Sequence, residues 1–161
     1  MKSNKYRNLD KSQKQIRLSI MNMIIDEKRP VSLDEVTKEL KESLNQDENN
    51  IKETLKLFLD KNIMVIDEDE YINYIYPVSA HPTMHQVTLA DKRTFNAMCA
   101  IDALGWRCTF HQDIDINSKC YVTGEDINIS IRDGKISSIN NPDLRVLHLN
   151  LDKYANWAAS C

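Results

Sequence analysis

A cysteine and an aspartate lie three residues apart in the segment TFNAMCAIDALG, residues 94–105. Its composition predicts one short helix that ends at Gly105, the residue type most suited to a left-handed helix cap. At 3.6 residues per turn, four side chains of this helix would share a face: Phe95, Met98, Cys99 and Asp102. Because an unpaired buried charge is costly, Asp102 on such a face must be protonated, hydrogen-bonded or directed into a cavity.

This pair of side chains has a definite chemical capacity. A thiolate is a nucleophile and a ligand for soft metal ions, and a carboxyl group one turn away can accept and return the thiol proton. Burial and a nearby thiolate would both raise the pKa of Asp102, which suits a proton donor. A cysteine and an aspartate at this spacing more often reflect ordinary packing, however, so the pair alone does not define a site.

Composition limits the class of protein. The chain has 161 residues, 42% of them hydrophobic, and a net charge of −3, which fits one globular domain or two small ones and gives no field that attracts nucleic acid or an anionic membrane. No apolar run approaches the roughly 18 residues of a membrane span. The basic start has no apolar segment after it, so we expect no signal peptide, a cytoplasmic location and reduced cysteines.

The first 76 residues have the pattern of a winged-helix-like domain. Apolar side chains at helical spacing predict helices over about 12–27, from a capping box at Ser32, and around Ile51 to Leu59. Two β-rich runs, 63–66 and 71–76, surround the acidic turn 67–70 and predict a hairpin. Since acids offset lysines on the third helix and the turn is entirely acidic, we disfavour nucleic-acid binding and favour a module that packs against the second half.

Residues 77–161 read as a small mixed sheet around the short helix that carries Cys99. The strands expected here are 84–89, 107–111, 114–116, 120–122, 127–131, 135–139 and 144–149, with a last helix over 153–160. The predicted fold class is therefore α+β, with a helical domain at 1–76 and a sheet domain at 77–161.

The second half resembles the organomercurial (alkylmercury) lyases from about Tyr76 to Cys161. The motifs that match are Tyr76-Pro77-Val78-Ser79-Ala80, Pro82-Thr83, His85-x-Val87, Met98-Cys99-Ala100-Ile101-Asp102-Ala103-Leu104, Cys120-x-x-Thr123-Gly124 and Cys161. Several separate motifs agree in order and spacing. The resemblance also implies a winged-helix-like first domain without a DNA-binding role.

That resemblance implies an enzyme that cleaves a carbon–mercury bond by protonolysis, giving a hydrocarbon and mercury(II). The family's two cysteines and one aspartate map onto Cys99, Cys161 and Asp102, which would bind mercury and transfer the proton. No cofactor is expected beyond mercury(II) as bound product. The expected partners are organomercurial compounds, low-molecular-weight thiols that support turnover, and a mercuric reductase that accepts the product. The alternative is a non-catalytic thiol-based binder or sensor of heavy metals that uses the first domain as a regulator.

The end of the sequence departs from that family, whose members continue beyond the cysteine matched by Cys161. A terminal carboxylate would raise the pKa of the Cys161 thiol. We therefore expect either an impaired enzyme or a sequence that continues, for instance through a stop codon read as selenocysteine.

Other reactive side chains have plainer interpretations. The four cysteines, Cys99, Cys108, Cys120 and Cys161, form no C-x-x-C pair, which argues against a structural zinc site. We interpret Cys108 and Cys120 as small buried side chains. We interpret His81 and His85 as packing or surface residues, and three aromatic residues as core or cavity wall: Trp106, Tyr154 and Trp157.

Overall fold

The computed structural model describes residues 8–105 and 112–147. The chain divides into two compact units, residues 1–76 and residues 77–161. Among the described residues, the first unit is mainly helical and the second contains an antiparallel sheet, so the α+β class expected from the sequence is confirmed. Within the described residues, no helix is both long enough and apolar enough to cross a membrane.

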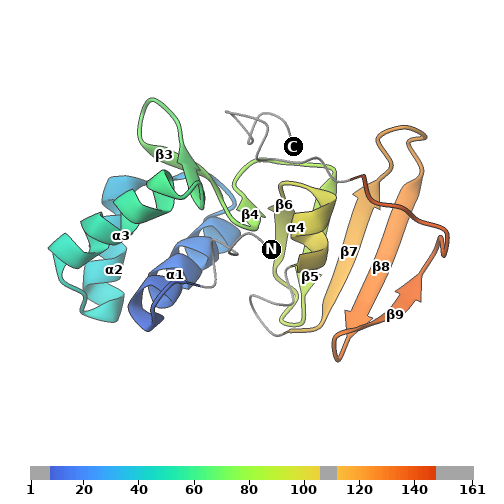
Figure 1. The fold of residues 1–161 in the computed structure, drawn as a ribbon, viewed down its shortest axis with the longest axis horizontal. Coiled ribbons are helices and arrows are strands. Elements are labelled where there is room, and N and C mark those ends of the chain that lie inside the picture. Colours follow the sequence, from blue (N-terminus) through green and yellow to red (C-terminus); the bar gives the residue numbers. More distant parts are fainter. Residues whose placement is uncertain (1–7, 106–111, 148–161) are drawn as a thin grey trace. The chain divides into compact units, whose positions relative to one another are not determined.

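Three helices make up most of the first unit: α1 (Lys11–Glu27), α2 (Leu33–Leu44) and α3 (Glu48–Asp60) (Figure 1). The capping box predicted at Ser32 is confirmed, with Glu35 as its partner. The helices contact one another and contribute fully or nearly fully buried side chains to a common core: Ile16, Ile20, Ile24, Val36, Leu40, Ile51, Leu55 and Phe58. Burial of these apolar faces, rather than helix propensity, supplies most of the stability of such helices.

A small antiparallel sheet completes the first unit. Strand β3 (Tyr71–Ile75) pairs with both β1 (Val31–Ser32) and β2 (Met64–Ile66). The predicted hairpin of β2 and β3 is thus confirmed. At its tip the carboxylate of Asp67 accepts hydrogen bonds from the amides of Asp69 and Tyr71, at 3.1 and 2.9 Å. The bond from the Tyr71 amide is the main reason that the pKa of Asp67 is lowered.

Arg17 ties α1 to the end of this unit. The side chain is only 7% exposed, and its Nε and Nη2 atoms donate hydrogen bonds to the Tyr76 carbonyl oxygen, at 3.1 and 3.0 Å. The guanidinium carbon also lies 5.6 Å from the centroid of the Tyr76 ring, within cation–π range. Because Tyr76 is the last residue of the first unit, this contact fixes the backbone at the unit boundary.

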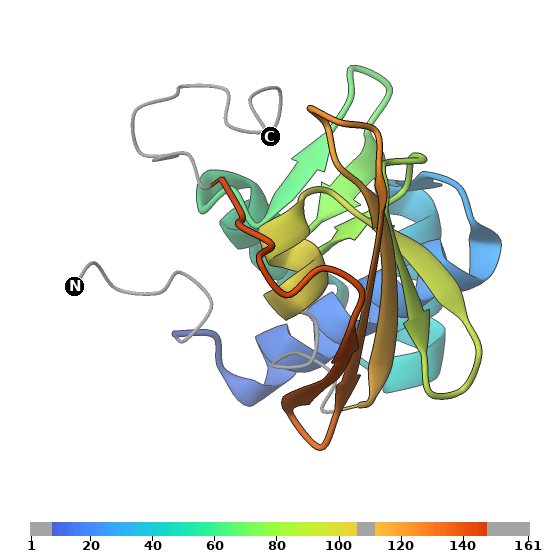
Figure 2. The same ribbon diagram turned by 90° about the vertical axis from the view of Figure 1, so that its right-hand side faces the viewer.

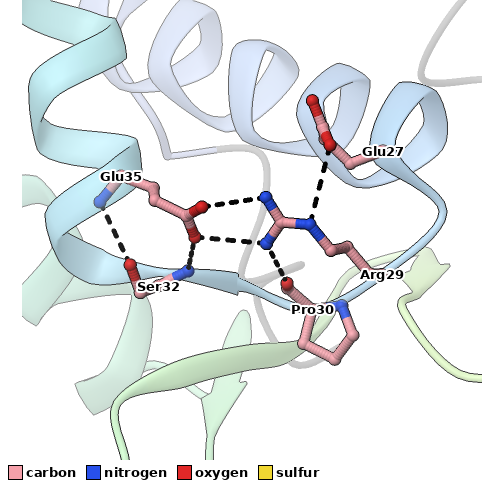
Figure 3. A network of polar contacts seen from close by, with 5 residues as sticks. All are labelled: Glu27, Arg29, Pro30, Ser32 and Glu35. Carbon is pink, nitrogen blue, oxygen red and sulfur yellow. Dashed lines mark hydrogen bonds and ion pairs between the residues drawn. The ribbon is translucent and has the colours of Figure 1, made fainter.

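An exposed polar network supports the start of α2. Glu35 accepts hydrogen bonds from Arg29 and from the Ser32 amide, while Arg29 also contacts Glu27 and the Pro30 carbonyl (Figure 3). The hydrogen bond from Arg29 is the largest of the effects that lower the pKa of Glu35 to about 2. Both side chains of this ion pair are nearly half exposed, so water and salt screen the attraction.

In the described residues of the second unit, six strands pair antiparallel in the order β4-β6-β5-β7-β8-β9. Their bounds are β4 (Val78–Ser79), β5 (His85–Leu89), β6 (Thr94–Ala97), β7 (Ile114–Lys119), β8 (Asp126–Arg132) and β9 (Lys135–Ile139). The alternating isoleucines at 127, 129 and 131 lie on β8 as predicted, and the turn Asp133-Gly134 leads into β9.

One short helix, α4 (Ala100–Gly105), packs on this sheet. It contacts β5, β6 and β7, and Figure 2 shows it on one face of the sheet. In the same view, residues 140–147 return along the side of the sheet that carries α4. The core beneath the helix is apolar and includes Val87, Leu89, Phe95, Ala97, Ala103, Ile114 and Ile116.

Several elements differ from the sequence-based expectation. The single helix predicted from Thr94 to Leu104 is wrong in its first half, where Thr94–Ala97 forms β6 between two other strands. Burial there alternates with the period of a strand, and Thr94 and Phe95 are types that favour one. The strand expected at 120–122 is a turn, and no strand forms over 144–147. The expected strand 107–111 and helix 153–160 lie outside the described residues.

Candidate active site at the start of helix α4

The structure places Cys99 directly before α4 and Asp102 in its first turn. The Cys99 carbonyl accepts a hydrogen bond of 3.0 Å from the Ala103 amide, so Cys99 occupies the N-cap position and Asp102 is the third helical residue. Cys99 is half-buried, whereas Asp102 is only 6% exposed. Residues at the N-cap and third positions of a helix lie over the same turn, where their side chains can meet.

The environment of this pair differs from the expected one. Phe95 and Met98 were expected on the same helix face, but Phe95 lies on β6 and Met98 in the bend that follows it. Only Cys99 and Asp102 keep the predicted one-turn relation. Asp102 is therefore buried on a short helix that packs on β5, β6 and β7, not on the longer apolar helical face that was expected.

A hydroxyl group fixes the backbone just before this pair. Thr83 Oγ1 donates to the Ala97 carbonyl oxygen at 2.6 Å and accepts from the His85 amide at 3.1 Å. Ala97 ends β6 and is completely buried. Thr83 belongs to one of the matching motifs, but its contact with Ala97 was not predicted from the sequence. A hydroxyl residue two positions before a strand was the available signal.

Cys161, the second expected mercury ligand, lies outside the described residues. The same holds for Cys108 and for the aromatic residues expected as core or cavity wall, Trp106, Tyr154 and Trp157. The described part of the candidate site is therefore the Cys99–Asp102 pair with the backbone that holds it.

Cys120 is not the buried side chain expected from the sequence. It is half-buried and begins the turn between β7 and β8, where its backbone bonds to Gly124 and Glu125 at 2.8 and 2.9 Å. Gly124 has a φ of 74°, a backbone conformation that favours glycine. Hydrogen bonds from the Thr123 hydroxyl, the Thr123 amide and the Val122 amide lower the pKa of the Cys120 thiol. The matching Cys-x-x-Thr-Gly motif thus forms a turn in which groups of Val122 and Thr123 donate hydrogen bonds to the Cys120 thiol.

The two histidines have the plainer role that was expected. His81 is exposed, and its amide donates to Ser79 Oγ at 3.2 Å. His85 is half-buried on β5, with Nδ1 at 3.0 Å from Ser118 Oγ on β7, and desolvation lowers the pKa of its imidazole. No cluster of three or more His, Cys, Asp or Glu side chains suited to a metal ion occurs in residues 8–105 and 112–147.

Comparisons with protein families and with solved structures both give matches. A family model for alkylmercury lyases matches residues 78–161. Among solved structures, the chain is similar to the crystal structure of the mercury-bound form of MerB2, with a TM-score of 0.63 and 27% sequence identity. That match covers 86% of this chain and 64% of the other, so this chain spans just under two thirds of that protein's length. The sequence matches no curated protein.

Proposed function

This chain belongs to the alkylmercury lyase family, whose model covers more than half of it, and we propose that it cleaves the carbon–mercury bond of organomercurial compounds. The observation that carries the proposal is the pair formed by the half-buried Cys99 and the buried Asp102, one helical turn apart within the matched segment. The similarity to a mercury-bound structure supports mercury as the element that this site receives.

In the proposed reaction, the Cys99 thiol gives its proton to Asp102 and the thiolate binds the mercury of an R–Hg⁺ ion. Thiolates are the protein ligands that soft metal ions prefer. The carbon–mercury bond then breaks with both electrons staying on carbon, and the proton on Asp102 moves to that carbon. The products are the hydrocarbon R–H and mercury(II), so no external electron donor is needed.

The burial of Asp102 fits this proton transfer. Removal from water disfavours the ionised form of a carboxyl group, so a buried aspartate can hold a proton between its acceptance and its release. Its place in the first turn of α4, one turn after Cys99, also supports a transfer of the proton from that thiol. A surface carboxylate would exchange that proton with water instead.

Cys161 is the proposed second mercury ligand, by resemblance to the family. Residues 140–147 run along the α4 side of the sheet, and 14 further residues follow Leu147. An extended chain of that length spans up to about 46 Å, so reach does not prevent a thiol of Cys161 from approaching Cys99. Small thiols would release mercury(II), and a mercuric reductase would be its acceptor.

For the first unit we propose a winged-helix-like module without a nucleic-acid role. The order of three helices and a hairpin supports the first part of this proposal. The charges support the second, because Lys41 and Lys52 are both paired with Glu48, at 2.6 and 2.8 Å. Lysines engaged in this way are less available to phosphate groups.

The test is benzene release from phenylmercury in the presence of excess small thiol. We expect turnover by the protein as given, none by Cys99→Ser, and a loss of about 10²- to 10⁴-fold in kcat for Asp102→Asn, since Asn keeps the shape but cannot donate the proton. Asp126→Asn, an exposed aspartate on β8, and Cys120→Ser are the matched controls and should keep wild-type rates.

Two other results would each overturn the proposal. Stoichiometric mercury uptake without benzene would identify a thiol-based binder or sensor. An Asp102→Asn variant that keeps the wild-type rate would remove the aspartate from the chemistry.

A further inference from the structure

We propose that Thr83 is a positioning residue whose hydroxyl group sets the backbone position of Cys99. The contact lies where the ladder between β5 and β6 stops. In this hairpin the Leu89 amide donates to the Arg93 carbonyl at 2.8 Å, and the paired residues continue to Val87↔Phe95 and Gln86↔Asn96. Hydrogen-bonded and non-hydrogen-bonded pairs alternate in an antiparallel ladder. The next pair to exchange hydrogen bonds would therefore be His85 and Ala97.

That pair does not join the ladder. The His85 amide donates to Thr83 Oγ1 instead, at 3.1 Å, and the same hydroxyl donates to the Ala97 carbonyl at 2.6 Å. The hydroxyl group thus takes the place of a direct bond between the two strands. Because the hydroxyl oxygen joins the two strands here in place of a direct bond, the spacing between β5 and the end of β6 depends on this side chain.

The contact determines the position of the end of β6, because contacts with β7 already hold β5 in place. On its other edge, His85 pairs with Ser118 of β7, and the two side chains lie 3.0 Å apart. The Lys119 amide also donates to the Met84 carbonyl at 3.2 Å. The other neighbour of β6 is β4, a strand of two residues in which Val78 is the partner of Ala97.

The chain leaves the sheet at this point to form the candidate site. Ala97 is completely buried and ends β6, and Cys99 follows two residues later as the N-cap of α4. Without the hydroxyl group, the Ala97 carbonyl has no access to water as a substitute partner. The strands would close to form the direct bond, or the carbonyl would rotate, and either change moves Cys99 relative to Asp102.

The inference deepens the proposed function and rests on it only for the kinetic part of the test. The main variant is Thr83→Val, which keeps the shape of the side chain and removes the hydroxyl. Thr83→Ser keeps the hydroxyl and removes the methyl group. Thr88→Val is the matched control on β5, because the Thr88 side chain forms no hydrogen bond with the residues that the structure describes.

The first readout is independent of turnover. Alkylation of each cysteine by iodoacetamide is followed by peptide mass spectrometry between pH 6 and 10, with Cys120 as the internal reference on its own turn. In Thr83→Val we expect the rate at Cys99 relative to Cys120 to change at least fivefold, while Thr83→Ser and Thr88→Val stay within twofold of wild type. In benzene release, we expect kcat to fall about 10- to 100-fold with little change in KM.

Three outcomes would overturn the inference: an unchanged Cys99-to-Cys120 ratio in Thr83→Val, a Thr83→Ser variant that behaves like Thr83→Val, or an equal effect of Thr88→Val. If Thr83→Val does not fold, Thr83→Ala carries the same test without a methyl group against the Ala97 carbonyl. Absence of benzene release by the wild-type protein would contradict the proposed function, whereas the alkylation ratio would still decide the role of Thr83.

Discussion

Replacement of Arg17 by methionine tests the energetic link between α1 and the end of the first unit. Methionine keeps most of the aliphatic stem and removes the guanidinium group. The variant loses two charge-assisted hydrogen bonds to one carbonyl oxygen, at 3.1 and 3.0 Å, and a cation–π contact with the Tyr76 ring. Since Arg17 is only 7% exposed, water does not replace these partners.

The expected loss follows from these contacts. Hydrogen bonds from a charged donor contribute about 1.5–3 kcal/mol, and a partly buried cation–π contact contributes about 1 kcal/mol. The methionine variant no longer has a buried charge, and the desolvation free energy that it avoids offsets part of this loss. We therefore expect a net decrease of about 2–3 kcal/mol in the free energy of unfolding. With a urea dependence of about 1 kcal/mol per M for a unit of this size, the unfolding midpoint should fall by about 2–3 M.

Urea unfolding followed by circular dichroism at 222 nm is the appropriate assay, because the three long helices all belong to the first unit. Arg29→Met is the control. Arg29 makes more polar contacts than Arg17 in the part of the chain that the structure describes, yet its side chain is 46% exposed (Figure 3). Its unfolding midpoint should therefore shift by less than about 0.5 M. A shift below about 0.5 M for Arg17→Met, or equal shifts for the two variants, would refute the argument that burial determines the contribution of these cations.

Two further predictions follow from individual side chains. The pKa of Glu35 is lowered to about 2 from its ordinary 4.5, so its ion pair with Arg29 stabilises the folded state above pH 4.5 and this contribution is lost as the pH falls towards 2. The difference in Tm between wild type and Glu35→Gln should accordingly narrow as the pH falls over that range. A difference that stays constant would show that the ionised Glu35 side chain does not stabilise the folded state. Gly124→Ala meets no atom within 4 Å but must adopt a φ of 74°, so we expect a loss of about 1 kcal/mol and a changed alkylation rate at Cys120 alone. An unchanged Cys120 rate would show that this turn does not set the reactivity of the thiol.

Local signals in the sequence determined much of the fold. The capping box at Ser32 and Glu35, the hairpin around Asp67 and the turn Asp133-Gly134 were all predicted, because each depends on residues within a few positions of one another. The alternating isoleucines of β8 were predicted for the same reason, since a half-buried strand has a period of two. The chemistry of a thiol and a carboxyl group one turn apart also follows from spacing alone.

Tertiary structure decided the surroundings of that pair. Residues 94–97 have no local signal strong enough to choose between helix and strand, and pairing with β4 and β5 makes them a strand. This choice moves Phe95 off the expected helix face and makes Cys99 the N-cap of α4. The contact of Thr83 with Ala97 spans 14 residues of sequence, so only the folded sheet brings hydroxyl and carbonyl together. Short-range patterns fix which side chains can react, but their positions depend on strand pairing between distant residues, which no local pattern encodes.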